Sequence, residues 1–416
     1  MLYKTKLHNG LQVIIEQDTN AKSCTFEYIV ACGSLDEQGN YYSNNNFGVA
    51  HFVEHMMFKG TINRNVDDIN NDIAAIGGHC NAATSFDHTL YYISSPADKW
   101  KDNLEILNDI FWNSTIPEDE FEQEKTVILE ELKMYEDRPR SKCMENLDVL
   151  INKNFPNRQH IAGTIESVSK LTVDDLKRFI KIFYQPNNVA LLISGNVPIK
   201  EVLADINIFL LYKEEEEQII TDRNKSFNKE IMNNQLIRLH KKDLTQAHLG
   251  FAIKGVPPYN EDYYIQDLIS DYLGGGFISK LYNIIREKLG LAYTVNVSIN
   301  SLRDTSYIIG YCGLKKENIN KVHKIIVKEL NKLKHILVNT QELEILKAQY
   351  RGQSLLALET TAAKLSVHED NFIYNTNYTI DSILDIVMNI TAEDIKNFAN
   401  KYFNEKNICW SIIEPK

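Results

Sequence analysis

Two histidines and a glutamate stand about one helical turn apart near the start of the chain. The stretch 47–60 has apolar residues at nearly helical spacing and ends in glycine, which predicts a short helix of about three turns. On such a helix His51 and His55 project from one face, with Glu54 beside them. Two neutral imidazoles can bind a metal ion, and an adjacent carboxylate can take a proton from an attacking water molecule. We therefore take His51 and His55 as candidate metal ligands and Glu54 as a candidate general base.

The alternative is that these three polar residues meet by chance on a surface helix. The flanking residues are hydrophobic, and imidazole and carboxylate groups on a mostly buried helix are costly without a partner. This cost favours a metal site over a chance arrangement.

A third ligand has to come from elsewhere, and a predicted helix at 117–135 is its best source. An apolar stripe runs along this helix at seven-residue spacing from Phe121, and Glu124 and Glu131 interleave it. Both carboxylates therefore point towards the core, where a buried carboxylate needs a cation or a hydrogen-bond donor. One should bind the metal and the other should support the site, but periodicity does not decide between them.

Length and composition place the chain among ordinary globular proteins. Its 416 residues suggest two or more domains, and its formal charge of -11 argues against nucleic acid as a partner. Six cysteines without a CxxC pair fit free thiols in a reducing compartment. The sequence shows no secretory signal and no apolar run long enough to cross a bilayer. We therefore expect a soluble cytoplasmic protein that does not bind membranes.

The sequence indicates an α+β domain that is duplicated within the chain. The segment 171–177 recurs at 390–396, an offset of 390 − 171 = 219 residues, and each copy continues through a helix and an aromatic pair into an apolar strand. We predict two homologous α/β-sandwich domains, each an antiparallel-rich sheet covered by helices. The predicted boundaries are 1–211 for a metal-binding catalytic domain, 212–234 for an acidic linker and 235–416 for a metal-free homologous domain.

Several elements of the first domain can be placed from their patterns. Besides the metal helix, we expect strands at 11–17 and 25–32, a helix at 66–76, a strand pair ending at 93, and helices at 100–112 and 117–135. In the second copy the segment that corresponds to the metal helix is Asp267–Tyr272, which has no histidine pair. One chain should therefore hold one metal ion.

The motifs together resemble the pitrilysin and insulysin family of inverted-motif zinc peptidases, in particular the branch of the mitochondrial processing peptidase and its small bacterial relatives. The resemblance covers nearly the whole chain. It is carried by His51-Phe52-Val53-Glu54-His55, Glu131, the run Gly77 to Ser85, Tyr91-Tyr92, Leu273 to Gly276, Arg286, Tyr293, Ala348 to Gly352 and Leu358 to Thr361.

For the metal centre, the resemblance implies one zinc ion bound by His51, His55 and Glu131. It also implies that Glu54 is the general base and that Glu124 supports the site from behind a ligand.

For the substrate, the resemblance implies that the strand around Asn81 and Ala82 binds a peptide backbone by edge addition. Arg286 and Tyr293 would contact substrate carbonyls near the scissile bond, where a cation and a phenol can stabilise an oxyanion. One departure is Ala83, which stands where many relatives carry an aromatic residue. The neighbouring pocket should therefore be wider or differently selective.

The resulting prediction is a zinc metalloendopeptidase that cleaves unfolded peptides inside a closed chamber formed by a homodimer. Two other functions stay open. The first alternative is a catalytic subunit that requires a different, metal-free partner. The second is a non-catalytic scaffold of the same fold. The complete set of metal and base residues counts against a scaffold, and the presence of Arg286 and Tyr293 on the same chain makes a second subunit less necessary.

Overall fold

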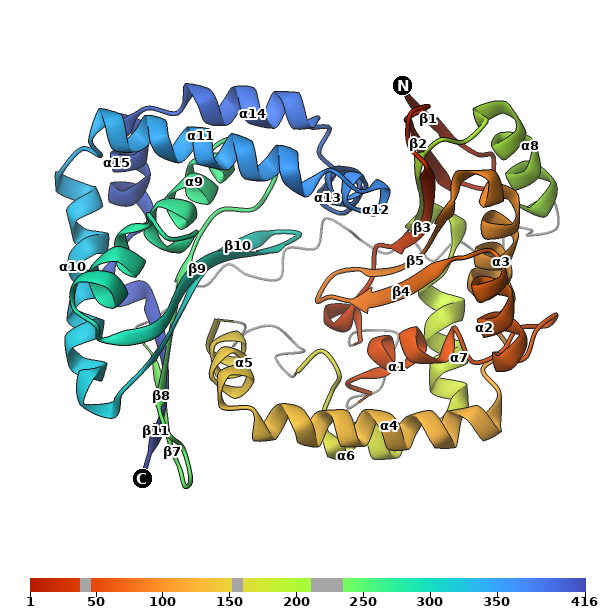
Figure 1. The fold of residues 1–416 in the computed structure, drawn as a ribbon. Coiled ribbons are helices and arrows are strands. Elements are labelled where there is room, and N and C mark those ends of the chain that lie inside the picture. Colours follow the sequence, from red (N-terminus) through yellow and green to blue (C-terminus); the bar gives the residue numbers. More distant parts are fainter. Residues whose placement is uncertain (38–45, 152–159, 211–234) are drawn as a thin grey trace. The chain divides into compact units, whose positions relative to one another are not determined.

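The computed structural model describes residues 1–37, 46–151, 160–210 and 235–416 (Figure 1). The predicted acidic linker at 212–234 lies outside these residues. The chain forms two compact units, and each draws on more than one stretch of sequence. The first comprises Met1–Lys133, Gln159–Asn224 and Ala357–Asn375, and the second comprises Met134–Arg158, Lys225–Leu356 and Thr376–Lys416. The predicted domain boundaries describe the duplication along the sequence and stay a prediction.

The first unit is built around a six-stranded sheet with the order β1-β2-β6-β3-β5-β4. Neighbouring strands are antiparallel except for the parallel pair β2 and β6. The strands are β1 (Leu2–Lys6), β2 (Gln12–Gln17), β3 (Ser23–Val30), β4 (His79–Thr84), β5 (Thr89–Pro96) and β6 (Val189–Gly195). The helices are α1 (Val49–Met56), α2 (Val66–Ala75), α3 (Trp100–Asn113), most of α4 (Glu118–Asp137), α6 (Ile165–Lys170), α7 (Val173–Phe183), α8 (Ile199–Leu210), α12 (Thr361–Lys364) and α13 (Ser366–Tyr374).

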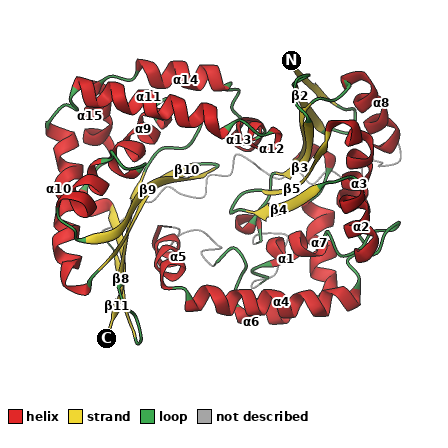
Figure 2. Cartoon of the chain, viewed as in Figure 1, coloured by secondary structure: helices red, strands yellow, loops and turns green. Residues whose placement is uncertain are grey.

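The second unit is built around a five-stranded sheet with the order β7-β11-β8-β10-β9. Figure 2 shows the long strands β9 and β10 of this sheet in yellow and the helices of the unit in red. Its strands are β7 (Leu236–Lys241), β8 (Ala247–Lys254), β9 (Ala292–Leu302), β10 (Thr305–Leu314) and β11 (Ile408–Pro415). Its helices are α5 (Pro139–Ile151), α9 (Tyr263–Gly274), α10 (Ile319–His335), α11 (Thr340–Ala357), α14 (Ile380–Asn389) and α15 (Ala392–Tyr402). Throughout the described part of the chain, no helix is long and apolar enough to cross a membrane.

The two sheets confirm the predicted α+β duplication. Without β1, the first sheet reads β2-β6-β3-β5-β4, and the second has the same pattern of connections and the same single parallel pair, β7 with β11. The repeated helices α7 and α15 begin alike, because Thr172 with Asp175 and Thr391 with Asp394 each form a reciprocal capping box. The sequence repeat thus marks two copies of one supersecondary pattern.

One face of the first sheet is covered by helices that lie far along the sequence. Leu365 and Phe372, from the α12–α13 segment, are buried with Ile14, Ile29 and neighbouring apolar residues of the sheet. Polar contacts border this apolar cluster: the Thr25 and Thr361 hydroxyls are 2.9 Å apart, and His368 Nε2 lies 2.8 Å from a carboxylate oxygen of Glu16. The sequence patterns gave no sign that residues beyond 357 complete the first unit.

The second sheet is covered in the reciprocal way, by α5 from the first half of the sequence. The Asn146 side-chain amide donates to the Ser411 hydroxyl of β11 over 3.4 Å. Gly250 of β8 allows α5 to approach, because a Cβ there would lie 3.0 Å from Leu147 Cδ1 and 3.1 Å from Cys143 Sγ. The two halves of the sequence therefore exchange helices between the units.

A pair of acidic residues, Glu27 buried and Glu369 partly buried, lies where α13 covers the first sheet. Glu27 of β3 is 3% exposed, and its Oε1 has no hydrogen-bond partner among the described residues. Burial raises the pKa of Glu27 well above its ordinary value, and the nearby Glu369 of α13 raises it further. Burial, followed by the charge of Asp370, likewise raises the pKa of Glu369 to about 7. Both groups therefore hold protons in the folded chain at pH values where the unfolded chain has released them.

We expect this pair to make the folded state less stable as the pH rises. Since both pKa values are raised on folding, their contribution is fully present below the ordinary pKa of 4.5 and is lost as the pH rises through the raised pKa values, that of Glu369 being about 7. The Glu27→Gln variant should reduce this loss by on the order of 1–3 kcal/mol. Urea unfolding of both proteins at pH 5.5 and pH 8 measures the difference, with the exposed Glu118→Gln as a control. Parallel losses in wild type and Glu27→Gln would contradict the assignment.

Candidate metal centre and active site

Helix α1 is held at its start by a buried carboxylate. Glu37 is fully buried, and its two carboxylate oxygens accept hydrogen bonds from the backbone amides of Gly48 and Ala50, each over 3.0 Å. Gly48 has φ 91°, a left-handed conformation that cannot continue a helix. The predicted helix over 47–60 is therefore too long, and α1 is limited to Val49–Met56.

The burial of α1 leaves its polar residues along one partly exposed face. Its apolar residues, including Phe52 and Val53, are completely buried in the core of the first unit. His51, Glu54 and His55 are only partly buried. Apolar packing therefore fixes the helix while its polar residues stay accessible.

Helix α4 packs against α1 through an aromatic stack. The rings of Phe52 and Phe121 lie 4.6 Å apart at an interplanar angle of 8°. Phe121, Glu124 and Ile128 are buried as the spacing predicted, although the buried stripe ends at Leu132. This contact sets the position of α4 along α1, so that both predicted carboxylates reach the histidines.

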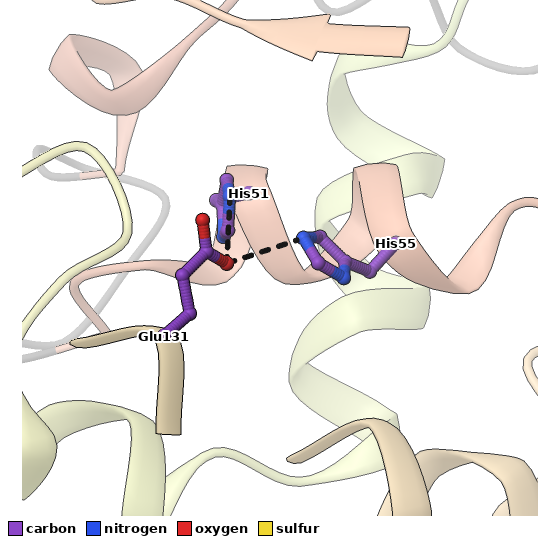
Figure 3. Close-up of side chains that lie close together, drawn as sticks. All are labelled: His51, His55 and Glu131. Carbon is purple, nitrogen blue, oxygen red and sulfur yellow. Dashed lines mark ion pairs between the residues drawn. The ribbon is translucent and has the colours of Figure 1, made fainter. Parts of the chain in front are cut away.

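Figure 3 shows the two imidazoles and the Glu131 carboxylate converging. Glu131 Oε2 lies 3.9 Å from His51 Nε2 and 3.7 Å from His55 Nε2. One ligand atom from each of the three residues lies within 4.8 Å of the others. Two nitrogens and one carboxylate oxygen are a donor set that zinc binds in catalytic sites.

The pKa values of the two histidines shift in opposite directions. Burial acts to lower the pKa of His55, but the hydrogen bond to Glu124 and the charges of Glu54, Glu124 and Glu131 outweigh burial and raise it. Burial, followed by the nearby His55 and His160, lowers the pKa of His51 to about 3, so its ring is neutral at neutral pH. His55 Nδ1 lies 2.7 Å from Glu124 Oε1, which leaves its Nε2 directed towards Glu131. When the neutral ring carries its proton on Nδ1 and donates that N–H to Glu124, the lone pair on Nε2 is free for a metal ion.

Glu124 contacts the site from behind His55. Its side chain is 9% exposed, and its Oε2 lies 2.6 Å from Lys59 Nζ while its Oε1 faces His55. Burial acts to raise the pKa of Glu124, but the hydrogen bonds to His55 and Lys59 outweigh burial and lower it. Glu124 is thus an ionised acceptor that faces Nδ1 of one histidine, whereas Glu131 faces Nε2 of both.

Glu54 lies beside the two histidines and under the edge strand β4. The Thr84 hydroxyl donates to Glu54 Oε2 over 2.6 Å. Burial raises the pKa of Glu54, although the contacts with Thr84 partly oppose the rise. A carboxylate with a raised pKa is suited to accept a proton during catalysis.

The predicted peptide-binding strand, β4, is at one edge of the first sheet. Only one side of β4 pairs with a described strand, β5. Asn81 is exposed, whereas Ala82 packs against the core. An edge strand of this kind has backbone groups free to pair with another extended segment.

Arg286 and Tyr293 belong to the second unit and lie close together in its sequence. Arg286 lies in a π-helical segment, Tyr282–Lys288, and its guanidinium stacks on the Tyr282 ring at 5.0 Å. Tyr293 lies near the start of β9 and is 64% exposed. Both side chains reach the surface of their unit, and π-helical segments are common at functional sites.

The second unit has a different cluster where the duplicated pattern would place a metal. Asp267 and Asp271 stand one turn apart on α9, and the Tyr350 hydroxyl of α11 donates to Asp267 over 2.7 Å. Burial raises the pKa of both carboxyl groups, that of Asp271 to about 7. Among the described residues, His51, His55 and Glu131 are the one group of three or more His, Cys, Asp or Glu residues that could hold a metal ion.

Comparison with known proteins identifies the family. The sequence pattern of Insulinase (Peptidase family M16) matches residues 12–165, and that of the Peptidase M16 inactive domain matches residues 170–350. An uncharacterized zinc protease of Rickettsia felis is 32% identical over 96% of this chain and 94% of its own length. This chain belongs to peptidase family M16. The resemblance to pitrilysin and insulysin peptidases is thereby confirmed.

Other M16 relatives match over the full length. The uncharacterized zinc protease YmxG of Bacillus subtilis is 29% identical over 100% of this chain and 98% of its own length. The crystal structure of a protease from Helicobacter pylori has the same fold, with a TM-score of 0.91 and 22% identity over 100% of this chain and 99% of that one. The family and these relatives make the chain a zinc metallopeptidase.

Three residues near the candidate site have roles that the sequence did not predict. Lys59 stands one turn after His55, a spacing that could have suggested a partner for a site carboxylate. Thr84 ends the edge strand, yet nothing in the sequence ties it to Glu54. Glu37 gave no signal, because its contact with the start of α1 joins residues that no helical or strand pattern relates.

We expect Glu131→Gln and Glu124→Gln to differ in their effects on zinc. Glu131→Gln should abolish tight zinc retention, because it removes the carboxylate that faces both Nε2 atoms. Glu124→Gln should weaken zinc affinity by only about 10- to 100-fold, because it alters the orientation of His55. Competition with a chromophoric chelator measures both affinities, and Glu130→Gln, on the exposed face of α4, is the matched control. Zinc loss confined to Glu124→Gln would reverse the two roles.

Proposed function

We propose that this M16 metallopeptidase is an endopeptidase that holds one zinc ion on His51, His55 and Glu131 and cleaves extended, unfolded peptides. The observation that carries the proposal is the convergence of two Nε2 atoms and one carboxylate oxygen beside Glu54. Zinc bound there would supply Lewis-acid chemistry, lowering the pKa of a water molecule and polarising a peptide carbonyl.

The residues of the chain have separate tasks in this reaction. Glu54 takes a proton from the attacking water molecule and delivers it to the nitrogen of the departing amine. Glu124 accepts a hydrogen bond from Nδ1–H of His55 and so fixes the orientation of that ring. Lys59 neutralises the outer oxygen of Glu124, since a buried carboxylate is stable only with partners.

The free edge of β4 selects the conformation of the substrate. A peptide that pairs with the backbone around Asn81 and Ala82 must be extended and must have unpaired amides. Folded proteins do not meet this condition, because their backbone groups are already paired. The site therefore favours unfolded segments, and Ala83 leaves room for a large substrate side chain nearby.

Arg286 and Tyr293 complete the site by stabilising the oxyanion. Their exposure on the second unit makes a cation and a phenol available to a bound carbonyl. A peptide on an edge strand gains little while it stays hydrated, so it needs a wall opposite β4. We infer a two-fold homodimer that encloses a chamber, with Arg286 and Tyr293 of one subunit serving the zinc site of the other.

The first test is the metal itself. The purified protein should contain about one zinc ion per chain, and a chelator should abolish cleavage of an unfolded fluorogenic peptide. Glu54→Gln should keep the zinc but lose at least about 100-fold in turnover, because the general base is absent. A zinc-free protein whose activity is unchanged by chelator would overturn the proposal. A zinc-loaded protein that cleaves nothing alone would instead favour the need for a different partner chain.

The second test is complementation between inactive chains. Glu54→Gln is mixed with Tyr293→Phe under conditions that allow subunits to exchange. If the two residues act across the dimer, each mixed dimer has one site with both defects and one with neither, so activity should partly return. Each variant incubated alone is the control, and gel filtration gives the oligomeric state. No recovery despite proven exchange would mean that the residues act within one chain or that the dimer is wrong.

A further inference from the structure

The general base is bonded to the strand proposed to bind the substrate. Thr84 is the last residue of β4, and its hydroxyl donates to Glu54 Oε2 over 2.6 Å. In the alternating pattern of β4, Thr84 shares its face with Cys80 and Ala82, which pack against the core. Its side chain is therefore directed from the strand towards α1.

Glu54 needs this bond because a glutamate side chain has several rotatable bonds and loses entropy when it is ordered. A general base must place one oxygen within about 3 Å of the proton that it takes. The Thr84 hydroxyl holds Oε2, and a backbone hydrogen bond from the same residue adds to the hold on the carboxylate. A β-branched threonine is well suited to this task, since few χ1 rotamers are open to it.

The hydrogen bond between Thr84 and Glu54 is connected through the backbone of β4 to the proposed peptide-binding residues. Thr84 lies only two residues beyond Ala82 on the strand whose free edge would pair with the peptide. A peptide that orders this edge also orders Thr84 and, through its hydroxyl, Glu54. Part of the binding energy of the peptide is then used to align the base, which raises turnover rather than affinity.

We propose that Thr84 is a positioning residue that links peptide binding on β4 to the alignment of Glu54. This role rests on the proposed function, because it requires Glu54 to be the base and β4 to be the binding strand. Within the described residues the Thr84 hydroxyl bonds to Glu54 and to no metal ligand, so its loss should leave the zinc site intact.

Thr84→Val is the direct test, because valine keeps the shape and strand preference of threonine and removes the hydroxyl. We expect kcat for an unfolded fluorogenic peptide to fall about 10- to 100-fold, the range for loss of alignment at a reacting group. KM and zinc content should change by less than about twofold, and Thr84→Ser, which restores the hydroxyl, should recover most of kcat. An unchanged kcat, or a raised KM at unchanged kcat, would overturn the proposal.

Two further measurements separate alignment from general weakening. In a Glu54→Gln background, Thr84→Val should cause little additional loss, because the group through which it acts is already gone. Crystal structures should show the Glu54 side chain in one rotamer in the wild type and in several in Thr84→Val. Full additivity of the two changes, or a single unchanged Glu54 rotamer, would refute a role through Glu54.

Thr25→Val is the matched control. Thr25 is a buried threonine of the same sheet, and its hydroxyl contacts Ser94 and Thr361 on the other face. This change should lower the melting temperature and leave kcat unaltered. If both valine variants lose activity in proportion to stability, the effect of Thr84 is structural. A wild-type chain that cleaves no peptide would overturn the proposed function as well, whereas an active wild type matched by Thr84→Val would remove only this inference.

Discussion

The site depends on how α1 and α4 pack together. His55 and Glu131 are 131 − 55 = 76 residues apart in the sequence, and the Phe52–Phe121 stack brings their helices into contact. A slip of α4 by one residue would rotate Glu124 and Glu131 by about 100° and turn both away from the histidines. Two stacked aromatic rings in a close-packed core resist such a slip, because any displacement opens a void. Precise coordination thus rests on ordinary apolar packing.

Several charges near the site are buried, and each has a partner. Glu37 accepts the amides at the start of α1, and Glu124 lies between His55 and Lys59. A buried carboxylate without such partners would be destabilising. The hydrogen bonds of these two carboxylates therefore hold their partner groups in place, as apolar packing holds the helices. Residues that do not bind the metal themselves therefore help to hold the candidate ligands in position.

Sequence patterns predicted much of this arrangement because its parts are local. His51, Glu54 and His55 share one helix, and the apolar stripe of α4 placed Glu124 and Glu131 inward, so helical periodicity alone was informative. Periodicity could not separate the two glutamates, because that depends on which imidazole nitrogen each one faces. The start of α1 was predicted too early because the left-handed conformation of Gly48 is not visible in an apolar pattern. The contacts of Glu37 and of α12–α13 join distant segments, which no local pattern records.

The exchange of helices between the two units has a consequence for synthesis on the ribosome. When residues 1–211 have emerged, the face of the first sheet that includes Ile14 and Ile29 still lacks the segment that covers it. That segment, 357–375, follows only after most of the second unit has been made. The nascent chain therefore presents an uncovered apolar sheet face from the completion of β6 until the segment 357–375 is made, and such a surface binds chaperones and promotes aggregation. The first unit begins to be synthesised before the second, but it lacks its last segment until near the end of translation. The two units therefore finish folding at about the same time.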